Sequence, residues 1–127
     1  MNGSILDTNV ITKMLNNDPI AIQMVKNVNK LYTSSIVAGE LFFAAFNSSR
    51  QEINLDIFRK ALSCMKIIPV DDAVCLSYAE IKFELKKKGK PIPDNDIWIA
   101  ACALAHDLSL ASFDKHFSEI SRLKVLE

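Results

Sequence analysis

The fold is decided by the segment Ser4-Ile5-Leu6-Asp7-Thr8-Asn9, residues 4–9, in which a short apolar run ends in a polar turn. Such a run is typical of a buried strand that leaves its sheet through a loop. The pattern then becomes helical over about residues 10–29, with a break at 16–19, where Asp18 can cap a second helix and Pro19 can begin it. The chain therefore starts as a strand followed by helices.

The same alternation continues to the end of the chain. We expect further strands at residues 31–33, 67–70, 108–111 and 123–125. We expect a helix to about residue 46, capped by Ser34 or Ser35, and a further helix at 55–65. Asp71 or Asp72 is expected to open a long helix that ends in the run of lysines before Gly89. We also expect a helix at about 95–106 and a short one at 115–120. Strands that alternate with helices imply an α/β fold with a mostly parallel sheet covered on both faces.

The length of 127 residues fits one globular domain, residues 1–127, and no repeat or Gly/Ser linker indicates a second. The longest apolar stretches, residues 36–38 and 41–46, are far shorter than the roughly 20 residues that cross a bilayer, so we expect no membrane segment. The residues Met1-Asn2-Gly3-Ser4 lack the basic start and the cleavage site of a secretory signal. We therefore expect a cytoplasmic protein.

The cysteines and histidines do not form a recognisable zinc motif. Cys64, Cys75 and Cys102 are odd in number and widely spaced among apolar neighbours, which favours reduced, buried thiols. His106 and His116 lie ten residues apart without a cysteine at ligand spacing, so we expect ordinary structural roles for both.

The charge is balanced, with 15 acidic and 15 basic residues, whereas nucleic-acid binders usually have a basic excess. A basic surface must therefore be local. One candidate cluster comprises Lys82, Lys86, Lys87, Lys88 and Lys90, and a second comprises Arg50, Arg59 and Lys60. The lysine cluster is either a solvated helix end or a binding surface for phosphates, and the sequence leaves both open.

Four acidic residues are expected near one edge of the sheet. Asp7 directly follows the first strand, and Asp114 comes three residues after the fourth. Glu40 lies in the second turn of the helix after the second strand, and Asp96 lies in the first turn of the helix that leads to the fourth. Because α/β active sites form where parallel strands end, we expect these side chains to meet there.

Carboxylates that lie within a few ångströms of one another repel unless a cation sits between them. Oxygen ligands without histidine or cysteine favour Mg²⁺ or Mn²⁺ over zinc. Such an ion can activate water and neutralise charge that builds up on a phosphodiester. An acidic site and a polyanionic substrate are therefore compatible, with surface lysines binding the flanking phosphates.

Taken singly, these acids have ordinary explanations. Asp7 can form an Asx turn, and Asp96 and Asp114 stand where helix starts favour acids. Glu40 is harder to explain, because residues 41–46 that follow it are all non-polar and its carboxylate needs a polar partner. The joint pattern is what favours a functional site.

Four segments carry a resemblance to PIN-domain nucleases. They are Leu6-Asp7-Thr8-Asn9, Ser35–Leu41, Pro91–Ala101 and Leu110–Phe117. The third resembles the motif whose metal-binding aspartate maps onto Asp96. The order, spacing and length match from end to end, and a free-standing chain of this size looks like a VapC-type toxin of a bacterial or archaeal toxin–antitoxin pair.

The resemblance implies a three-layer α/β/α sandwich with a five-stranded parallel sheet. It implies Mg²⁺ or Mn²⁺ held chiefly by Asp7 and Asp96, with Glu40 and Asp114 completing the catalytic acids. It also implies endonucleolytic cleavage of RNA by a metal-activated water, inhibition by a cognate antitoxin protein, and a homodimer.

Other residues of these motifs are expected to support the site. Thr8 and Asn9 are expected to orient Asp7 or a metal-bound water. Asp94 is expected to cap the helix at 95–106, with a role as a fifth ligand as the alternative.

Two positions in the fourth motif depart from the commonest family pattern. Ser112 stands where threonine is usual, which keeps the hydroxyl group. Phe113 replaces a residue that is more often polar, which leaves the pose of Asp114 less defined.

Phe42, Phe43 and Phe46 cover more than one face of their helix. We expect them in the core, since folds of this class bury helices deeply. The alternative is that some lie at a protein–protein contact, with a second copy or with an antitoxin.

The sequence is also compatible in part with three other functions. A haloacid-dehalogenase-type phosphatase needs a second aspartate where Asn9 stands. A receiver-type signalling domain needs a phospho-acceptor after the third strand, where Asp71 and Asp72 stand, but it also needs an acidic neighbour that Asp7 lacks. A PIN-like binding module without catalysis would be expected to have lost some of the four acids.

Overall fold

The computed structural model contains a parallel four-stranded sheet with the order β3-β2-β1-β4. The strands are β1 (Ser4–Leu6), β2 (Leu31–Ser34), β3 (Lys66–Ile68) and β4 (Ser109–Ala111). Ile5 of β1 lies opposite Tyr32 of β2 and Leu110 of β4. The structure describes residues 3–126, so Met1 and Asn2, on which the expectation about a secretory signal partly rests, lie outside the described residues, as does Glu127.

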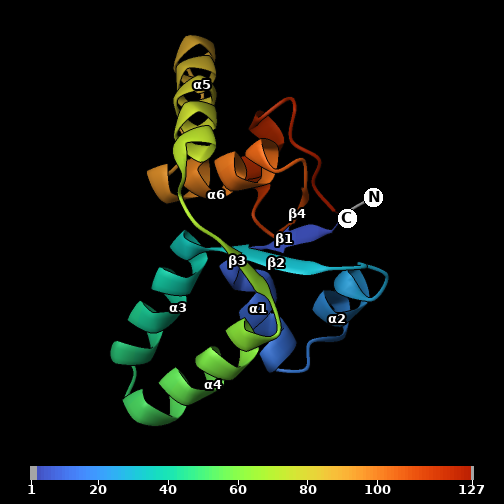
Figure 1. Ribbon diagram of the computed structural model, residues 1–127, viewed down its shortest axis with the longest axis vertical. Helices are drawn as coiled ribbons and strands as arrows, with labels where there is room; N and C mark the ends of the chain where they lie inside the picture. Colours follow the sequence, from blue (N-terminus) through green and yellow to red (C-terminus); the bar gives the residue numbers. More distant parts are fainter. Residues whose placement is uncertain (1–2, 127) are drawn as a thin grey trace.

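Helices cover both faces of this sheet (Figure 1). One layer contains α1 (Thr8–Leu15), α2 (Pro19–Val25), α3 (Ser35–Phe46) and α4 (Gln51–Ser63). The opposite layer contains α5 (Asp72–Lys88), α6 (Asp94–Ala105) and the short 3-10 helix η1 (Lys115–Glu119). The expected three-layer α/β/α fold is therefore confirmed.

The fifth strand, expected at residues 123–125, is reduced to a single parallel bridge between Leu110 and Val125. Two backbone hydrogen bonds hold this bridge, from Leu110 N to Lys124 O and from Leu126 N to Leu110 O, each 2.8 Å long. The Leu123 N–H instead bonds the Ile120 carbonyl in a turn, which leaves too short an extended segment for a strand. The expectation of five strands is therefore wrong, and the sheet has four.

Most helices begin at the side chains that the sequence indicates. Asp18, Ser34 and Asp71 each accept a hydrogen bond from the backbone N–H three residues further on, at 3.0 to 3.2 Å. These bonds satisfy amide groups that a helix start leaves without partners. Helix α4 begins at Gln51, four residues before the expected start at 55.

Asp94 does not cap α6, contrary to expectation. Pro93 occupies the cap position, and no side chain bonds the first amide groups of the helix. The Asp94 carboxylate instead accepts hydrogen bonds from the Tyr78 hydroxyl at 2.7 Å and from Lys82 Nζ at 3.0 Å, both on α5. The Asp94 carboxylate therefore links α6 to α5 and does not bond the amide groups at the start of its own helix.

The core lies between the sheet and its helices, and Ile5, Leu6, Leu110 and Ile99 are fully or almost fully buried there. Cys102 is buried as expected. The expectation of buried thiols is wrong for Cys64, at the end of α4, and for Cys75, in the first turn of α5, since both side chains are exposed.

The phenylalanines of α3 only partly enter the core. Phe43 and Phe46 are 68% and 57% exposed, so the expectation of core positions is wrong for these two. Phe42 is half-buried, and the Arg59 guanidinium lies 5.2 Å from the centre of its ring. The outer side of α3 therefore presents apolar surface. None of the helices within residues 3–126 is both long enough and apolar enough to cross a membrane.

The strand order excludes a receiver-type domain. In that fold the third strand pairs with the first. Here β3 is an edge strand separated from β1 by β2, and Asp71, which follows β3, caps α5. The acids after β1 and β3 are therefore not arranged as a receiver requires.

Substitution of Gly3 by alanine is expected to lower the free energy of unfolding by about 1–3 kcal/mol, because of overpacking. A Cβ atom there would lie 2.4 Å from the Lys30 carbonyl oxygen and 2.6 Å from the Tyr32 ring. Gly39 is the matched control, since a Cβ atom there meets nothing within 4 Å. We expect Gly39→Ala to raise the stability of α3 by about 0.5–1 kcal/mol. Urea denaturation of both variants checks this, and equal effects would contradict it.

Candidate metal centre at the carboxyl edge of the sheet

The candidate site lies where the chain reverses the direction in which it builds the sheet. From β1 the chain adds β2 and β3 on one side and returns to add β4 on the other. The loops after β1 and β4 therefore diverge, and such switch points are where α/β folds bind ligands. Asp7 follows β1 directly, and Ser112 follows β4 directly.

Asp7 is a buried carboxylate, only 5% exposed, at the start of α1. Its Oδ1 accepts a hydrogen bond from the Thr8 backbone N–H at 2.8 Å, and its Oδ2 accepts one from the Ser112 hydroxyl at 2.7 Å. Desolvation nevertheless raises the pKa of Asp7 to about 6, with smaller contributions from the charges of Asp96 and Glu40. The Asp7 side chain is thus fixed in position, but its two hydrogen bonds do not fully offset the cost of burying its negative charge.

Ser112 connects the acids that follow β1 and β4. Its hydroxyl donates to Asp7 and accepts a hydrogen bond from the Asp114 backbone N–H at 3.0 Å. Asn9 supports the same loop, because its side-chain oxygen accepts a hydrogen bond from the Phe113 N–H at 3.1 Å. In this structure Asn9 therefore bonds the loop after β4, whereas the expectation was that it orients Asp7 or a metal-bound water.

Glu40 enters the site from α3 with two polar partners. The Thr8 hydroxyl donates to one of its carboxylate oxygens, and the Asn95 side-chain amide donates to the other. The requirement for a polar partner, inferred from its apolar neighbours, is therefore confirmed. The Thr8 side chain orients Glu40, while its backbone N–H bonds Asp7.

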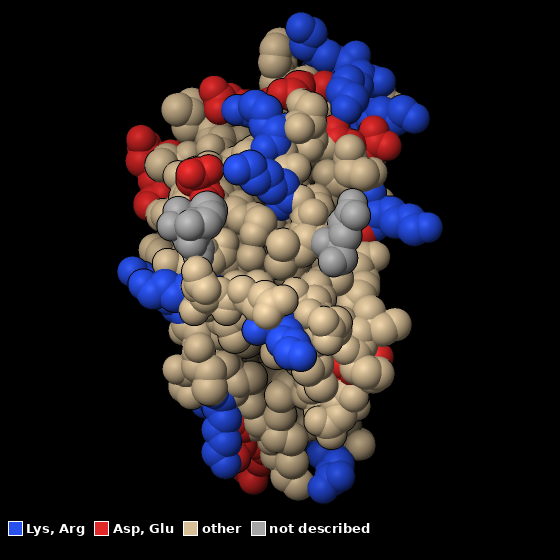
Figure 2. All heavy atoms as spheres, turned by 90° about the vertical axis from the view of Figure 1, so that its right-hand side faces the viewer, with Lys and Arg blue, Asp and Glu red and all other residues tan. Residues whose placement is uncertain are grey.

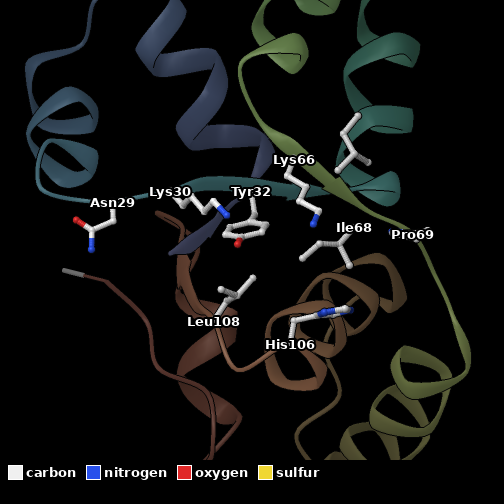
Figure 3. A pocket seen from close by; sticks show the side chains of 9 residues that line it. Asn29, Lys30, Tyr32, Lys66, Ile68, Pro69, His106 and Leu108 are labelled. Carbon is white, nitrogen blue, oxygen red and sulfur yellow. The ribbon is translucent and has the colours of Figure 1, made fainter. Parts of the chain in front are cut away.

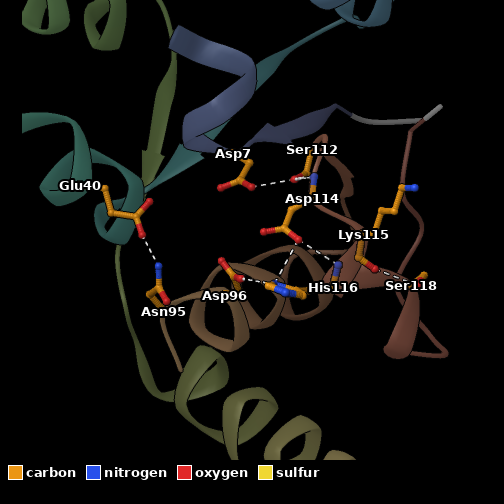
Figure 4. Close-up of polar contacts among 9 residues, drawn as sticks. All are labelled: Asp7, Glu40, Asn95, Asp96, Ser112, Asp114, Lys115, His116 and Ser118. Atoms are coloured by element: carbon orange, nitrogen blue, oxygen red, sulfur yellow. Dashed lines mark hydrogen bonds and ion pairs between the residues drawn. The ribbon is translucent and has the colours of Figure 1, made fainter. Parts of the chain in front are cut away.

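Asp96 and Asp114 converge on one imidazole nitrogen (Figure 4). Nδ1 of His116 lies 3.1 Å from Asp96 Oδ2 and 3.1 Å from Asp114 Oδ1. Burial raises the pKa of Asp96, which is 7% exposed, although the His116 hydrogen bond opposes this shift. The pKa of His116 is raised, chiefly by its hydrogen bond to Asp96.

The structure thus brings Asp7, Glu40, Asp96 and Asp114 to the same end of the sheet (Figure 4). Asp94 does not join them, because its carboxylate is engaged with α5.

Asn95 and His116 contact the acids, but the sequence analysis did not predict either of them as a site residue. The spacing of His106 and His116 does not match a zinc motif, and it therefore predicted only structural roles for both. The signal that would have found His116 is its position two residues after Asp114, in a turn that returns the ring to the acid.

A hard divalent cation fits these residues. Within residues 3–126, no lysine or arginine forms an ion pair with any of the four acids. Asp96, Asp114 and His116 each offer a ligand atom, and these atoms lie within 4.8 Å of one another. Carboxylates held this close need a positive partner, and oxygen donors suit Mg²⁺ or Mn²⁺.

A separate open pocket of about 480 Å³ lies elsewhere, at β2 and β3 (Figure 3). Its lining includes Lys30, Tyr32, Lys66 and His106 and contains no carboxylate. This pocket is therefore distinct from the acidic site.

Basic side chains are spread over the face seen in Figure 2 and gather at its top, the end of the molecule where α5 ends in Figure 1. The last turn of α5 contains Lys86, Lys87 and Lys88. Within the expected lysine cluster, Lys82 pairs with Asp94, and Lys88 Nζ bonds the Glu119 backbone oxygen at 2.6 Å. Part of the cluster is thus used to hold the fold together.

Comparisons with known proteins agree with this arrangement. The family model for the PIN domain matches residues 4–123. Ribonuclease VapC2 of Haemophilus influenzae is 35% identical over 109 residues, which are 84% of this chain and 83% of the relative. The solved VapBC-1 from nontypeable Haemophilus influenzae has a TM-score of 0.86 at 31% identity, covering 96% of this chain and 95% of that one. VapBC2 from Rickettsia felis, bound to a DNA fragment from their promoter, has a TM-score of 0.85 at 27% identity and covers 98% of both chains.

The raised pKa of Asp7 predicts a pH dependence of stability in the metal-free protein. Between about pH 4 and 6 the folded state holds a proton that the unfolded state releases, so the free energy of unfolding falls as the pH rises through this window. We expect Asp7→Asn to remove this loss, on the order of 2–3 kcal/mol. Urea denaturation of both proteins in EDTA from pH 4 to 7 measures the difference, and parallel profiles would contradict it.

Proposed function

The chain belongs to the PIN-domain family, and on that premise we propose that it is a Mg²⁺- or Mn²⁺-dependent endoribonuclease, the toxin of a toxin–antitoxin pair. The observation that carries this proposal is the convergence of Asp7, Glu40, Asp96 and Asp114 from four separate segments. We propose that residues 1–127 act as one PIN domain in the cytoplasm, where the RNA substrate is found.

Asp7 and Asp96 are the proposed chief ligands of the metal, with Asp114 beside them. When bound, the metal supplies activation of water and neutralisation of charge on the phosphodiester. Asp7 is held by Thr8 and Ser112, so its carboxylate does not need to reorganise on binding.

Glu40 has a different role from the proposed chief ligands. Its carboxylate oxygens are hydrogen-bonded by Thr8 and Asn95, which fixes it at the edge of the acidic group. We propose that Glu40 orients the water that attacks the phosphodiester, because this role requires a hydrogen-bond acceptor in a defined position. The exposed lysines at the end of α5 are suited to bind flanking phosphates.

A catalytically silent PIN-like module is disfavoured by the supporting contacts. A domain that had lost catalysis would not require Thr8, Ser112 and Asn95 to hold three carboxylate groups or their loops in position. Of these contacts, the Ser112–Asp7 hydrogen bond is buried, and a buried polar contact is retained where its geometry matters. The arrangement therefore supports an active nuclease.

The proposed partners are an antitoxin and a second copy of the chain. The solved relatives are named as VapBC proteins, and this chain covers nearly the whole of each matching chain. Phe43 and Phe46 provide exposed apolar side chains on α3, which suits burial against another protein.

Asp7→Asn and Asp96→Asn are each expected to lower Mn²⁺-dependent RNA cleavage at least about 100-fold while leaving the fold intact, because each removes a charged ligand. The matched control is Asp72→Asn, which alters an exposed acid at the start of α5. Cleavage of a labelled RNA is measured together with circular dichroism. A folded Asp96→Asn protein that cuts at the wild-type rate would overturn the assignment.

Expression of the wild-type chain in a bacterial host is expected to arrest growth. Expression of the Asp96→Asn variant is expected to leave growth unaffected. Co-expression of a short antitoxin-like reading frame, where one adjoins the gene, is expected to restore growth and to yield a complex on purification. Colony counts and size-exclusion chromatography check both parts. Growth that is unaffected by soluble wild-type protein would contradict the toxin assignment.

A further inference from the structure

The His116 ring nitrogen Nδ1 lies between two of the four acids. This nitrogen lies 3.1 Å from Asp96 Oδ2 and 3.1 Å from Asp114 Oδ1. Neighbouring ligands of an octahedral ion lie about 3 Å apart, since ion–ligand distances are about 2.1 Å. The two nitrogen–oxygen distances therefore match the spacing of neighbouring ligands around a single ion, and the two carboxylate oxygens lie within 4.8 Å of each other.

The local backbone fixes this position. The His116 N–H donates to Asp114 Oδ1 at 2.9 Å in the first turn of η1. Phe117, the next residue, is fully buried and anchors the turn in the core. The ring is therefore placed by packed structure, as is typical of a metal ligand that needs little reorganisation.

The imidazole can present the required lone pair. Ionised carboxylates only accept hydrogen bonds, so in the metal-free protein Nδ1 carries the proton that faces Asp96 and Asp114. A bound cation would take the place of this proton, while Nε2 keeps its own. The His116 side chain is 48% exposed, so Nε2 can be solvated. His106 provides the contrast within the same chain. Its Nε2 lies 3.9 Å from Asp71 and its ring lines the separate pocket at β2 and β3.

Building on the proposed metal-dependent nuclease, we propose that His116 is a direct ligand of the metal through Nδ1, which makes the centre a mixed carboxylate–imidazole site. Imidazole binds first-row transition ions better than it binds Mg²⁺. The site therefore selects Mn²⁺ over Mg²⁺ more strongly than a centre of carboxylates alone.

The direct test is pulsed electron paramagnetic resonance of bound Mn²⁺, which detects the ¹⁴N nucleus of a coordinated imidazole. We expect ¹⁴N modulation in the wild type and in the matched control His106→Ala, and its loss in His116→Ala. Absence of modulation in wild type that binds Mn²⁺, or its persistence in His116→Ala, would overturn the inference.

A second variant separates ligation from a purely structural role. His116→Asp replaces the nitrogen with an oxygen donor, and we expect the ratio of Mg²⁺ to Mn²⁺ dissociation constants to fall about tenfold. Calorimetric titration of both ions into wild type and variant measures this ratio. An unchanged ratio in a folded variant that binds Mn²⁺ would contradict ligation by His116.

The outcomes also distinguish this inference from the proposed function. If wild type binds Mn²⁺ through Asp7 and Asp96 but shows no nitrogen coupling, only the role of His116 fails. If wild type binds no Mn²⁺, both His116 ligation and metal-dependent cleavage fail.

Discussion

The electrostatic cost of burying Asp7 between the ends of β1 and β4 is the constraint on which the site depends. The carboxylate is almost inaccessible to water, and its two hydrogen bonds, from Thr8 and Ser112, leave its pKa raised to about 6. A buried charge with few compensating partners is unfavourable, so a cation beside Asp7 would stabilise its ionised form. The polar contacts of Ser112 and Asn9 follow from the same requirement, since they hold the loops that bring other acids to Asp7.

Much of this arrangement could be predicted because it depends on where strands end. Asp7 and Asp114 follow short apolar runs that are typical of buried strands, and parallel strands present their ends at one edge. Glu40 could be placed because a carboxylate among non-polar neighbours needs a partner, which it finds in Thr8 and Asn95. The resemblance to PIN domains rests on these same positions.

The remainder depends on tertiary contacts that local patterns do not encode. Asp94 stands where a cap is favoured, yet the Tyr78 hydroxyl on α5 takes its carboxylate. His116 acquires its role from the turn of η1 and from the position of Asp96 on another helix. The prediction of a fifth strand was wrong for a similar reason. The Leu123 N–H bonds the Ile120 carbonyl in a turn and so does not take part in the sheet.

The central claim is that a divalent cation occupies the space that Asp7, Asp96 and Asp114 enclose. An anomalous difference map from a crystal grown with Mn²⁺, recorded on both sides of the manganese absorption edge, tests this most directly. The account predicts one strong peak within bonding distance of Asp96 and Asp114 and facing Asp7. A well-ordered crystal with no peak there, or with its only peak at the basic pocket around Lys30 and Lys66, would contradict it.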